Sequence, residues 1–159
     1  MESELKFPTF DCMISDTVEQ YDSDVEMYFI KNQDLSTRLA ELRFSDPEFK
    51  KNYEKMLQYL KELSHSIVYK TEPPNHQFLI DLCMGPEDEG DTLKLLMESK
   101  TPLVAQLVGA SLVVREMMFW FVRMSRVPSF SKGFTVDRFQ GFSFLRLALV
   151  YRALKINGN

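Results

Sequence analysis

The segment from residue 101 to residue 127 constrains the fold most, because its apolar side chains would lie on every side of a helix. Seven apolar residues alternate at spacings of four and three, which is typical of a continuous seam of helix packing: Leu103, Leu107, Ala110, Val114, Met117, Phe121 and Met124. Most positions off this seam are apolar too, including Val108 and Phe119. A helix that is apolar all round is buried inside its protein or lies in a membrane.

The charges within this segment favour the buried helix over the membrane span. The uncharged run that ends before Arg115 covers 14 residues, whereas a span needs about 20 apolar residues. Arg115 and Glu116 would lie near the centre of the bilayer, where an ionised group costs several kcal/mol. We therefore expect no membrane span, and a structural ion pair for each of the two charges. The expected partners are Arg138 or Arg146 for Glu116, and an acid of the N-terminal arm for Arg115.

Helix signals also precede and follow the central segment. Ser45, with Glu48 three residues on, has the spacing of a capping box, and Pro47 stands in the first turn that such a box would open. An apolar stripe follows at helical spacing: Phe49, Tyr53, Met56, Leu57, Leu60, Leu63 and Ile67. Asp16 would open an earlier helix in the same way, and the runs QFLIDL and TLKLLMESK predict two short helices. The final segment, about 135–156, is apolar over more than half of its circumference.

These patterns predict an all-α fold. We expect a single compact helical domain of about six to seven helices over residues 15–159, after an irregular acidic arm over residues 1–14. The length of 159 residues suits one domain, and 6 Gly and 7 Pro are few for a turn-rich β-sandwich. The two long C-terminal helices, about 101–127 and 135–156, should be largely buried as a hairpin that the upstream helices wrap.

Charge is distributed unevenly along the chain. Residues 1–26 carry eight acids against Lys6, a net of −7, whereas residues 115–159 carry eight bases against two acids, a net of +6. The acidic arm either docks on the basic C-terminal region or is a solvated tail, and the tail is the simpler expectation because charge runs are usually solvated. Ser23 lies among the acids, which makes it a candidate phosphorylation site that would strengthen such docking.

No enzymatic or metal-binding motif is visible in the sequence. There is no Walker loop, GxGxxG, HExxH, nucleophile elbow or kinase signature, and His65, His76, Cys12 and Cys83 lack the spacing of metal ligands. We therefore expect no metal, no cofactor and no catalysis. Two distant cysteines, and an N-terminus without signal-peptide features, predict an intracellular protein of the cytoplasm or nucleus that is not secreted.

The surplus of apolar helix surface predicts a non-enzymatic protein–protein interaction module, a subunit or adaptor of an intracellular complex. Aromatic residues, Met and Arg are enriched at interfaces, so the expected mode is helix packing, either as a homodimer or with a partner helix laid in a groove. The candidate contacts lie at the end of the central segment and in the loop after it: Met118, Phe119, Trp120, Arg123, Arg126, Phe130 and Phe134. A core role for Phe119 and Trp120 is equally compatible with their apolar character.

The alternative hypothesis is a nucleic-acid-binding accessory protein that uses a basic C-terminal surface. Its candidate residues are Lys132, Arg138, Arg146, Arg152 and Lys155. The isoelectric point of about 5.3 is far from the basic footprint of a dedicated binder. The arginines of the last segment are also spread around its circumference, so this hypothesis ranks second.

Overall fold

The computed structural model describes residues 23–83 and 97–158, and all regular structure within them is helical. The elements in chain order are α2 (Ser23–Ser45), the 3-10 helix η1 (Pro47–Phe49), α3 (Lys50–Tyr69), α4 (Gln77–Leu82), α6 (Pro102–Met124), the 3-10 helix η2 (Pro128–Gly133) and α7 (Val136–Asn157). The all-α fold class is therefore confirmed. The arm over residues 1–14, the helix start at Asp16 and most of the TLKLLMESK helix lie outside the described residues.

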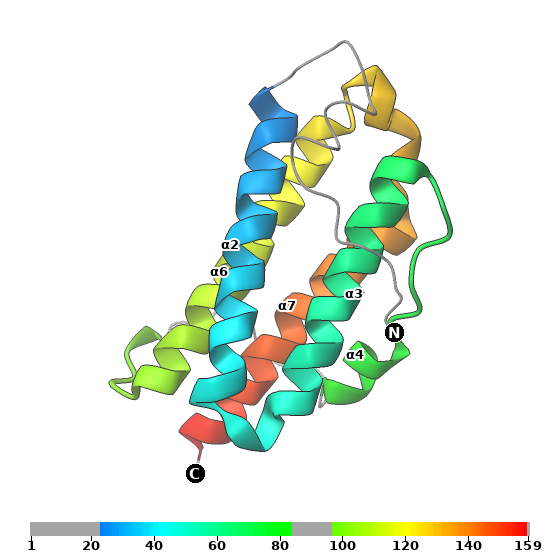
Figure 1. Ribbon diagram of the computed structural model, residues 1–159. Coiled ribbons are helices and arrows are strands. Elements are labelled where there is room, and N and C mark those ends of the chain that lie inside the picture. The colour runs from blue at the N-terminus through cyan, green and yellow to red at the C-terminus, as the bar shows by residue number, and fades with distance from the viewer. Residues whose placement is uncertain (1–22, 84–96, 159) are drawn as a thin grey trace.

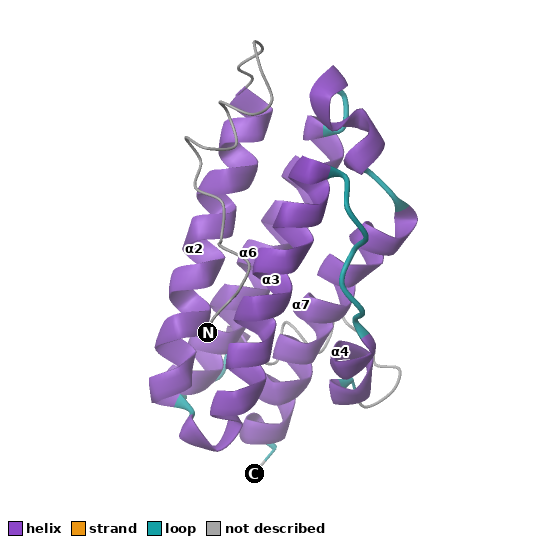
Figure 2. Ribbon diagram, turned by 45° about the vertical axis from the view of Figure 1, so that its right-hand side comes forward, coloured by secondary structure: helices purple, strands orange, loops and turns teal. Residues whose placement is uncertain are grey.

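The long helices of the described residues, α2, α3, α6 and α7, run side by side (Figures 1 and 2). The most extensive packing joins α6 to α7, and α6 also packs against α2, which in turn packs against α3. The hairpin predicted from the two long C-terminal segments is therefore confirmed. Short α4 lies against α7, and its Phe78 meets Tyr59 of α3 edge to face, so α4 covers part of the edge between α3 and α7.

The predicted seam of α6 forms the centre of the core. Six of its seven residues are buried, and Leu103 is partly buried against the same cluster. Within the described residues α6 is the one helix long and apolar enough to cross a membrane, a criterion that core helices of soluble proteins also meet. The absence of a membrane span stays a prediction that rests on Arg115 and Glu116, which stand midway along the helix.

The helix boundary predicted at Ser45 is wrong. Ser45 is the last residue of α2, and Asp46 precedes the 3-10 turn with non-helical backbone angles, φ −134° and ψ 71°. The Asp46 carboxylate makes no capping bond to that turn, because it binds side chains of α3 and α7 instead. Pro47 does occupy a first turn, as predicted, but the turn belongs to η1.

The expected burial of Arg115 and Glu116 is also wrong, because both residues are exposed. Glu116 pairs with Lys31 of α2, with Nζ 3.0 Å from Oε1, and not with Arg138 or Arg146. This pair lies along the edge where the antiparallel helices α2 and α6 meet. Surface pairs of this kind contribute at most about 1 kcal/mol to stability. The Lys31–Glu116 pair is therefore a minor contribution to the packing of α2 on α6.

A glycine allows α7 to approach α3. Gly141 of α7 faces the buried side chain of Tyr59, and a Cβ atom at this position would overlap the phenolic oxygen and lie 3.3 Å from Cζ. The Tyr59 ring has little room to move, because it also packs edge to face on Phe78 with centroids 5.8 Å apart. The side chain of Tyr59 therefore requires glycine at position 141.

We expect Gly141→Ala to lower the free energy of unfolding by about 2 kcal/mol, the usual effect of overpacking a core. Urea denaturation measures this loss, with the exposed neighbour Gln140→Ala as a control that changes little. In a Tyr59→Phe background the overlapping oxygen is gone, so the effect of Gly141→Ala should shrink by at least half. An equal loss in both backgrounds would contradict the proposed steric cause.

Candidate interaction surface on α6

The C-terminal half of α6 presents one stripe of exposed side chains. Arg115, Phe119, Val122 and Arg126 follow one another at spacings of four, three and four, which places them on one side of the helix. All four are exposed, and Phe119 and Val122 expose 56% and 42% of their surface. We call these four residues the outer stripe. An apolar pair framed by an arginine at each end is thus open to solvent.

Arg123 and two aromatic rings form a cluster beside the outer stripe. Phe119 and Trp120 meet edge to face, with centroids 4.9 Å apart and planes at 83°. The Arg123 guanidinium carbon lies 5.8 Å from each of the two centroids, within the range of a cation–π contact. Trp120 is partly buried and packs on the core, whereas Phe119 is not part of it. The cluster therefore joins the core to the exposed stripe.

Asp24 of α2 holds the two arginines at the end of α6. Arg123 donates from Nε to Oδ1 of Asp24 at 3.2 Å, and Nη2 of Arg126 lies 3.6 Å from Oδ2. These contacts place the start of α2 against the end of α6 (Figure 1). Ser23, the candidate phosphorylation site, is exposed and precedes Asp24 directly. The expected docking of residues 1–14 lies outside the described residues.

Three of the seven predicted contact residues face inward instead. Phe130 is buried in the core at 2% exposure. Phe134 stacks on Phe121 of the core seam, with centroids 5.1 Å apart and planes at 26°. Met118 is partly buried and packs on the same core. The surface position expected for Phe130 is therefore wrong, because η2 folds this ring under the end of the bundle. Phe119, Trp120, Arg123 and Arg126 are the predicted residues that the structure brings together.

The five basic candidates do not form one surface. Lys132 on η2 and Lys155 on α7 are exposed, and Arg146 is half-buried and already engaged. Arg138 is buried at 5% exposure, and the Arg152 side chain exposes 12%. The predicted surface position is wrong for Arg138 because backbone carbonyls take up its N–H groups, and Arg152 is likewise held by a carboxylate.

Arg138 ties three segments together at one end of the bundle. Its Nε donates to Ser66 Oγ at 3.0 Å, and Nη2 donates to the carbonyls of Ser66 and Thr71 at 3.2 and 2.7 Å. Nη1 donates to the carbonyl of Gly133 in η2 at 3.1 Å. Burial lowers the pKa of the Arg138 guanidinium, and the charges of Asp137 and Glu72 offset part of this effect. Arg138 thus stabilises the C-terminal end of α3, where carbonyls lack helical partners.

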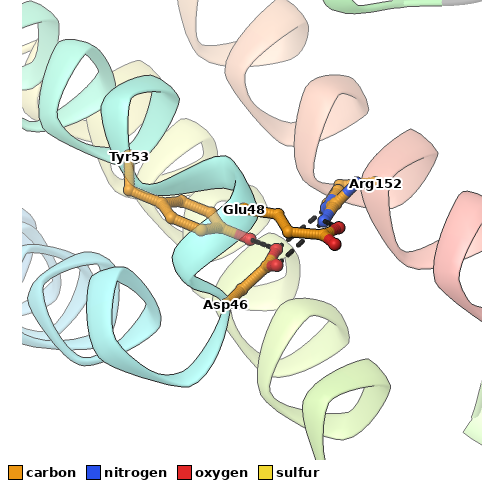
Figure 3. Close-up of polar contacts among 4 residues, drawn as sticks. All are labelled: Asp46, Glu48, Tyr53 and Arg152. Carbon is orange, nitrogen blue, oxygen red and sulfur yellow. Dashed lines mark hydrogen bonds and ion pairs between the residues drawn. The ribbon is translucent and has the colours of Figure 1, made fainter.

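Asp46 and Arg152 form a corresponding tie near the other end (Figure 3). Arg152 donates from Nε and Nη2 to the two carboxylate oxygens of Asp46, each at 2.8 Å, and the Tyr53 hydroxyl donates to Oδ2 at 2.7 Å. Glu48 is exposed and 3.6 Å from Nη2. Burial would raise the pKa of Asp46, but the hydrogen bonds and the charge of Arg152 outweigh it, so this pKa is lowered.

A small cavity of about 220 Å³ lies beside this tie. Its walls come from η1, α4 and α7: Phe49, Leu82, Ala148, Tyr151, Arg152 and Lys155. Typical ligand pockets range from about 300 to 1,000 Å³. The cavity is thus small for a ligand, and the guanidinium that borders it is occupied by Asp46. This cavity is therefore a weaker candidate for function than the outer stripe.

Sequence reasoning missed Arg115 and Val122 on the outer stripe, and Asp24 and Asp46 as the carboxylates that hold arginines. The spacing of the outer stripe is present in the sequence, but the apolar seam on the opposite side of the same helix gives a longer and stronger pattern. Asp46 could have been noticed, because it forms an Asp-Pro pair with Pro47 at the end of a helical run. Such pairs often begin a turn.

Within residues 23–83 and 97–158, no group of three or more His, Cys, Asp or Glu side chains is arranged to hold a metal ion. Comparison of the chain with protein-family models, with curated proteins and with solved structures finds no match.

Proposed function

We propose that this protein is a non-enzymatic interaction module, a subunit or adaptor of an intracellular assembly. It binds a protein partner through the outer stripe of α6 and the adjoining Trp120 and Arg123. The observation that carries this proposal is the exposure of Phe119 and Val122 between two arginines, on a helix whose opposite side forms the core. Aromatic and arginine side chains are the residues most often found at the energetic centre of interfaces.

The chemistry of the outer stripe defines the kind of partner. Phe119 and Val122 gain from burial against apolar side chains, at about 25 cal/mol per Å². Arg115 and Arg126 pair best with carboxylates, which they bind in bidentate geometry. We infer an amphipathic partner helix with apolar residues at its middle and an acidic residue toward each end.

A second copy of the chain is a poorer partner for this surface. In a two-fold dimer the same patch meets itself. An antiparallel pairing of outer stripes would set Arg115 against Arg126 of the other copy, and a parallel pairing would set each arginine against its own equivalent. Like charges at such an interface are repulsive. This favours a different protein as the occupant over the homodimer.

Nucleic-acid binding has less support, because Arg138 and Arg152 are used inside the fold. Exposed bases remain at Lys132 and Lys155, on η2 and near the end of α7. The net charge of −4 also disfavours a polyanion.

A photo-crosslinking amino acid at Val122 of the full chain tests the proposal in the native cell. We expect an adduct with one other protein, reduced at least tenfold by Arg115→Glu with Arg126→Glu, because two ion pairs become repulsive. Gln33, exposed on α2, is the matched control position and should give no such adduct. Equal adducts at Val122 and Gln33, adducts with a second copy of the chain, or adducts with nucleic acid would each overturn the assignment.

The same surface must be dispensable for folding. Phe119→Ser should lower the free energy of unfolding by no more than about 1 kcal/mol, because it removes one exposed aromatic pair with Trp120 and no core contact. Phe121→Ser, two positions along and buried in the core seam, should lower it by about 3 kcal/mol or more. This pair of variants separates loss of binding from loss of fold.

A further inference from the structure

We propose that Ser23 is a phosphorylation site for an acid-directed serine/threonine kinase, and that its phosphate engages Arg123 and Arg126 at the end of α6. The consequence for partner binding rests on the function proposed above. The phosphorylation and the contact with the arginines do not depend on it.

Ser23 has the accessibility and the sequence surroundings that such a kinase requires. Its side chain is exposed, and it is the first described residue of α2. Helix ends fray readily, which gives an enzyme access to the local backbone. Acids precede it at Asp22, follow it at Asp24 and stand three residues on at Glu26. A kinase with a basic substrate groove selects this charge pattern.

The reaction is an ordinary phosphoryl transfer from ATP. The Ser23 oxygen forms a bond to the γ-phosphorus while the bond to the β,γ-bridging oxygen breaks, and ADP leaves. The hydroxyl proton passes to the catalytic base of the kinase. The product carries about −1.5 to −2 charge and three strong acceptor oxygens.

The structure provides receptors for this phosphate. Asp24, the neighbour of Ser23, is already bound by Arg123 and Arg126, so both guanidinium groups lie at the start of α2. Their side chains expose 42% and 67% of their surface, so both arginines are accessible from solvent. Two cations surround the single carboxylate of Asp24, and arginine binds phosphate oxygens in bidentate geometry. Asp24 and Glu26 together offset the two positive charges, so the attraction rests on the bidentate hydrogen bonds that the two guanidinium groups donate to phosphate oxygens.

Occupying these arginines changes the proposed interaction surface. Arg123 now lies over Phe119 and Trp120, and Arg126 frames one end of the outer stripe. A phosphate on Ser23 engages both where they already lie, beside Asp24, and places negative charge where an acidic partner residue would dock. Phosphorylation should therefore weaken the binding of an acidic amphipathic helix.

Treatment of the folded, full-length protein with ATP and an acid-directed kinase tests the site. We expect one phosphate per chain, mapped to Ser23 by mass spectrometry, absent from Ser23→Ala and at least fivefold slower in Glu26→Gln. Ser131, exposed on η2 without acidic neighbours, should remain unmodified. No modification, modification at another serine, or an unchanged rate in Glu26→Gln would overturn the assignment.

Thermal unfolding of the phosphorylated protein tests the contact with the arginines. The Tm should rise by about 2–4 °C on phosphorylation, and this rise should vanish in Arg123→Gln with Arg126→Gln. An unchanged Tm, or an equal rise in both proteins, would exclude the contact.

The crosslink at Val122 then tests regulation, and it should fall at least threefold on phosphorylation of Ser23. An undiminished crosslink would refute the regulatory role. If no crosslink forms before phosphorylation either, the proposed function fails, whereas the mass-spectrometry and Tm results still decide the site.

Discussion

Asp46→Ala is expected to lower the free energy of unfolding by about 3–5 kcal/mol, the usual effect of removing one partner of a buried ion pair. The carboxylate of Asp46 is buried and accepts hydrogen bonds from Arg152 and from the hydroxyl of Tyr53. Without it, the Arg152 side chain, which exposes 12% of its surface, is left with the exposed Glu48 at 3.6 Å, and the buried hydroxyl of Tyr53 loses its acceptor. Urea denaturation at neutral pH measures the loss.

The exposed pair Asp34–Arg38 provides the matched control. Like the Asp46–Arg152 pair, it joins an aspartate to an arginine, with Nε of Arg38 2.9 Å from Oδ1 of Asp34. The side chains of Asp34 and Arg38, however, expose 37% and 42% of their surface. Asp34→Ala should therefore change the free energy of unfolding by less than about 0.5 kcal/mol. Comparable losses in the two variants would show that burial of the Asp46 pair has no special weight, and would contradict the prediction.

The pH dependence gives a second measure of the same tie. Because the pKa of Asp46 is lower in the folded state than its ordinary value of 3.8, the ion pair contributes fully above that value and is lost as the pH falls below it. The stability difference between wild type and Asp46→Asn should therefore be constant near neutral pH and shrink below about pH 4. A difference that grows with acidity would refute the lowered pKa.

The sequence predicted the helices correctly where buried apolar residues recur at helical spacing. The seam from Leu103 to Met124 and the stripe from Phe49 to Ile67 each identified the buried side of a helix, and Pro47 marked a first turn. The boundary at Ser45 failed because a capping box describes local hydrogen bonds alone. The carboxylate of Asp46 instead accepts hydrogen bonds from Tyr53 and Arg152, which lie 7 and 106 positions along the chain. A local sequence pattern does not show these partners.

The candidate site was readable in part for the same reason. Sequence composition placed the candidate surface at the end of the central helix, yet it could not separate Phe119, which is exposed, from Phe121, which is buried two residues later. The sequence also could not show that Arg138 and Arg152 are internal. An arginine is expected at the surface unless the acceptors of its hydrogen bonds are known. Those acceptors are carbonyls and a carboxylate from distant segments, brought close by tertiary packing alone.

The tie through Arg138 also supports the end of the bundle that carries the proposed surface. Its bond to the carbonyl of Gly133 holds η2, which begins four residues after α6 ends and places Phe130 in the core. Phe134, directly after η2, stacks on Phe121 of α6. The position of the last turns of α6, and hence of Arg123 and Arg126, depends in this way on a residue that touches no part of the outer stripe.

We therefore expect Arg138→Met to lower the free energy of unfolding by about 3 kcal/mol. Arg138 donates four hydrogen bonds, each contributing about 1.5–3 kcal/mol to stability, and their sum would predict a larger loss. The loss is smaller because the substitution also removes the cost of burying a cation, a cost that is evident in the lowered pKa of Arg138. Arg138→Lys should recover less than half, because a single ammonium cannot reach the carbonyls of Ser66, Thr71 and Gly133 in the geometry of the guanidinium fork.

Denaturation with urea measures this loss, and hydrogen exchange locates it. Amides of residues 66–71 and 130–135 should exchange faster in Arg138→Met than those of α2, because those segments lose a shared donor. Lys132→Met, an exposed cation on η2, is the control and should leave both measurements unchanged. Uniform acceleration across all helices would mean that Arg138 stabilises the whole fold without a local role, and the dependence of the α6 surface on this tie would then be refuted.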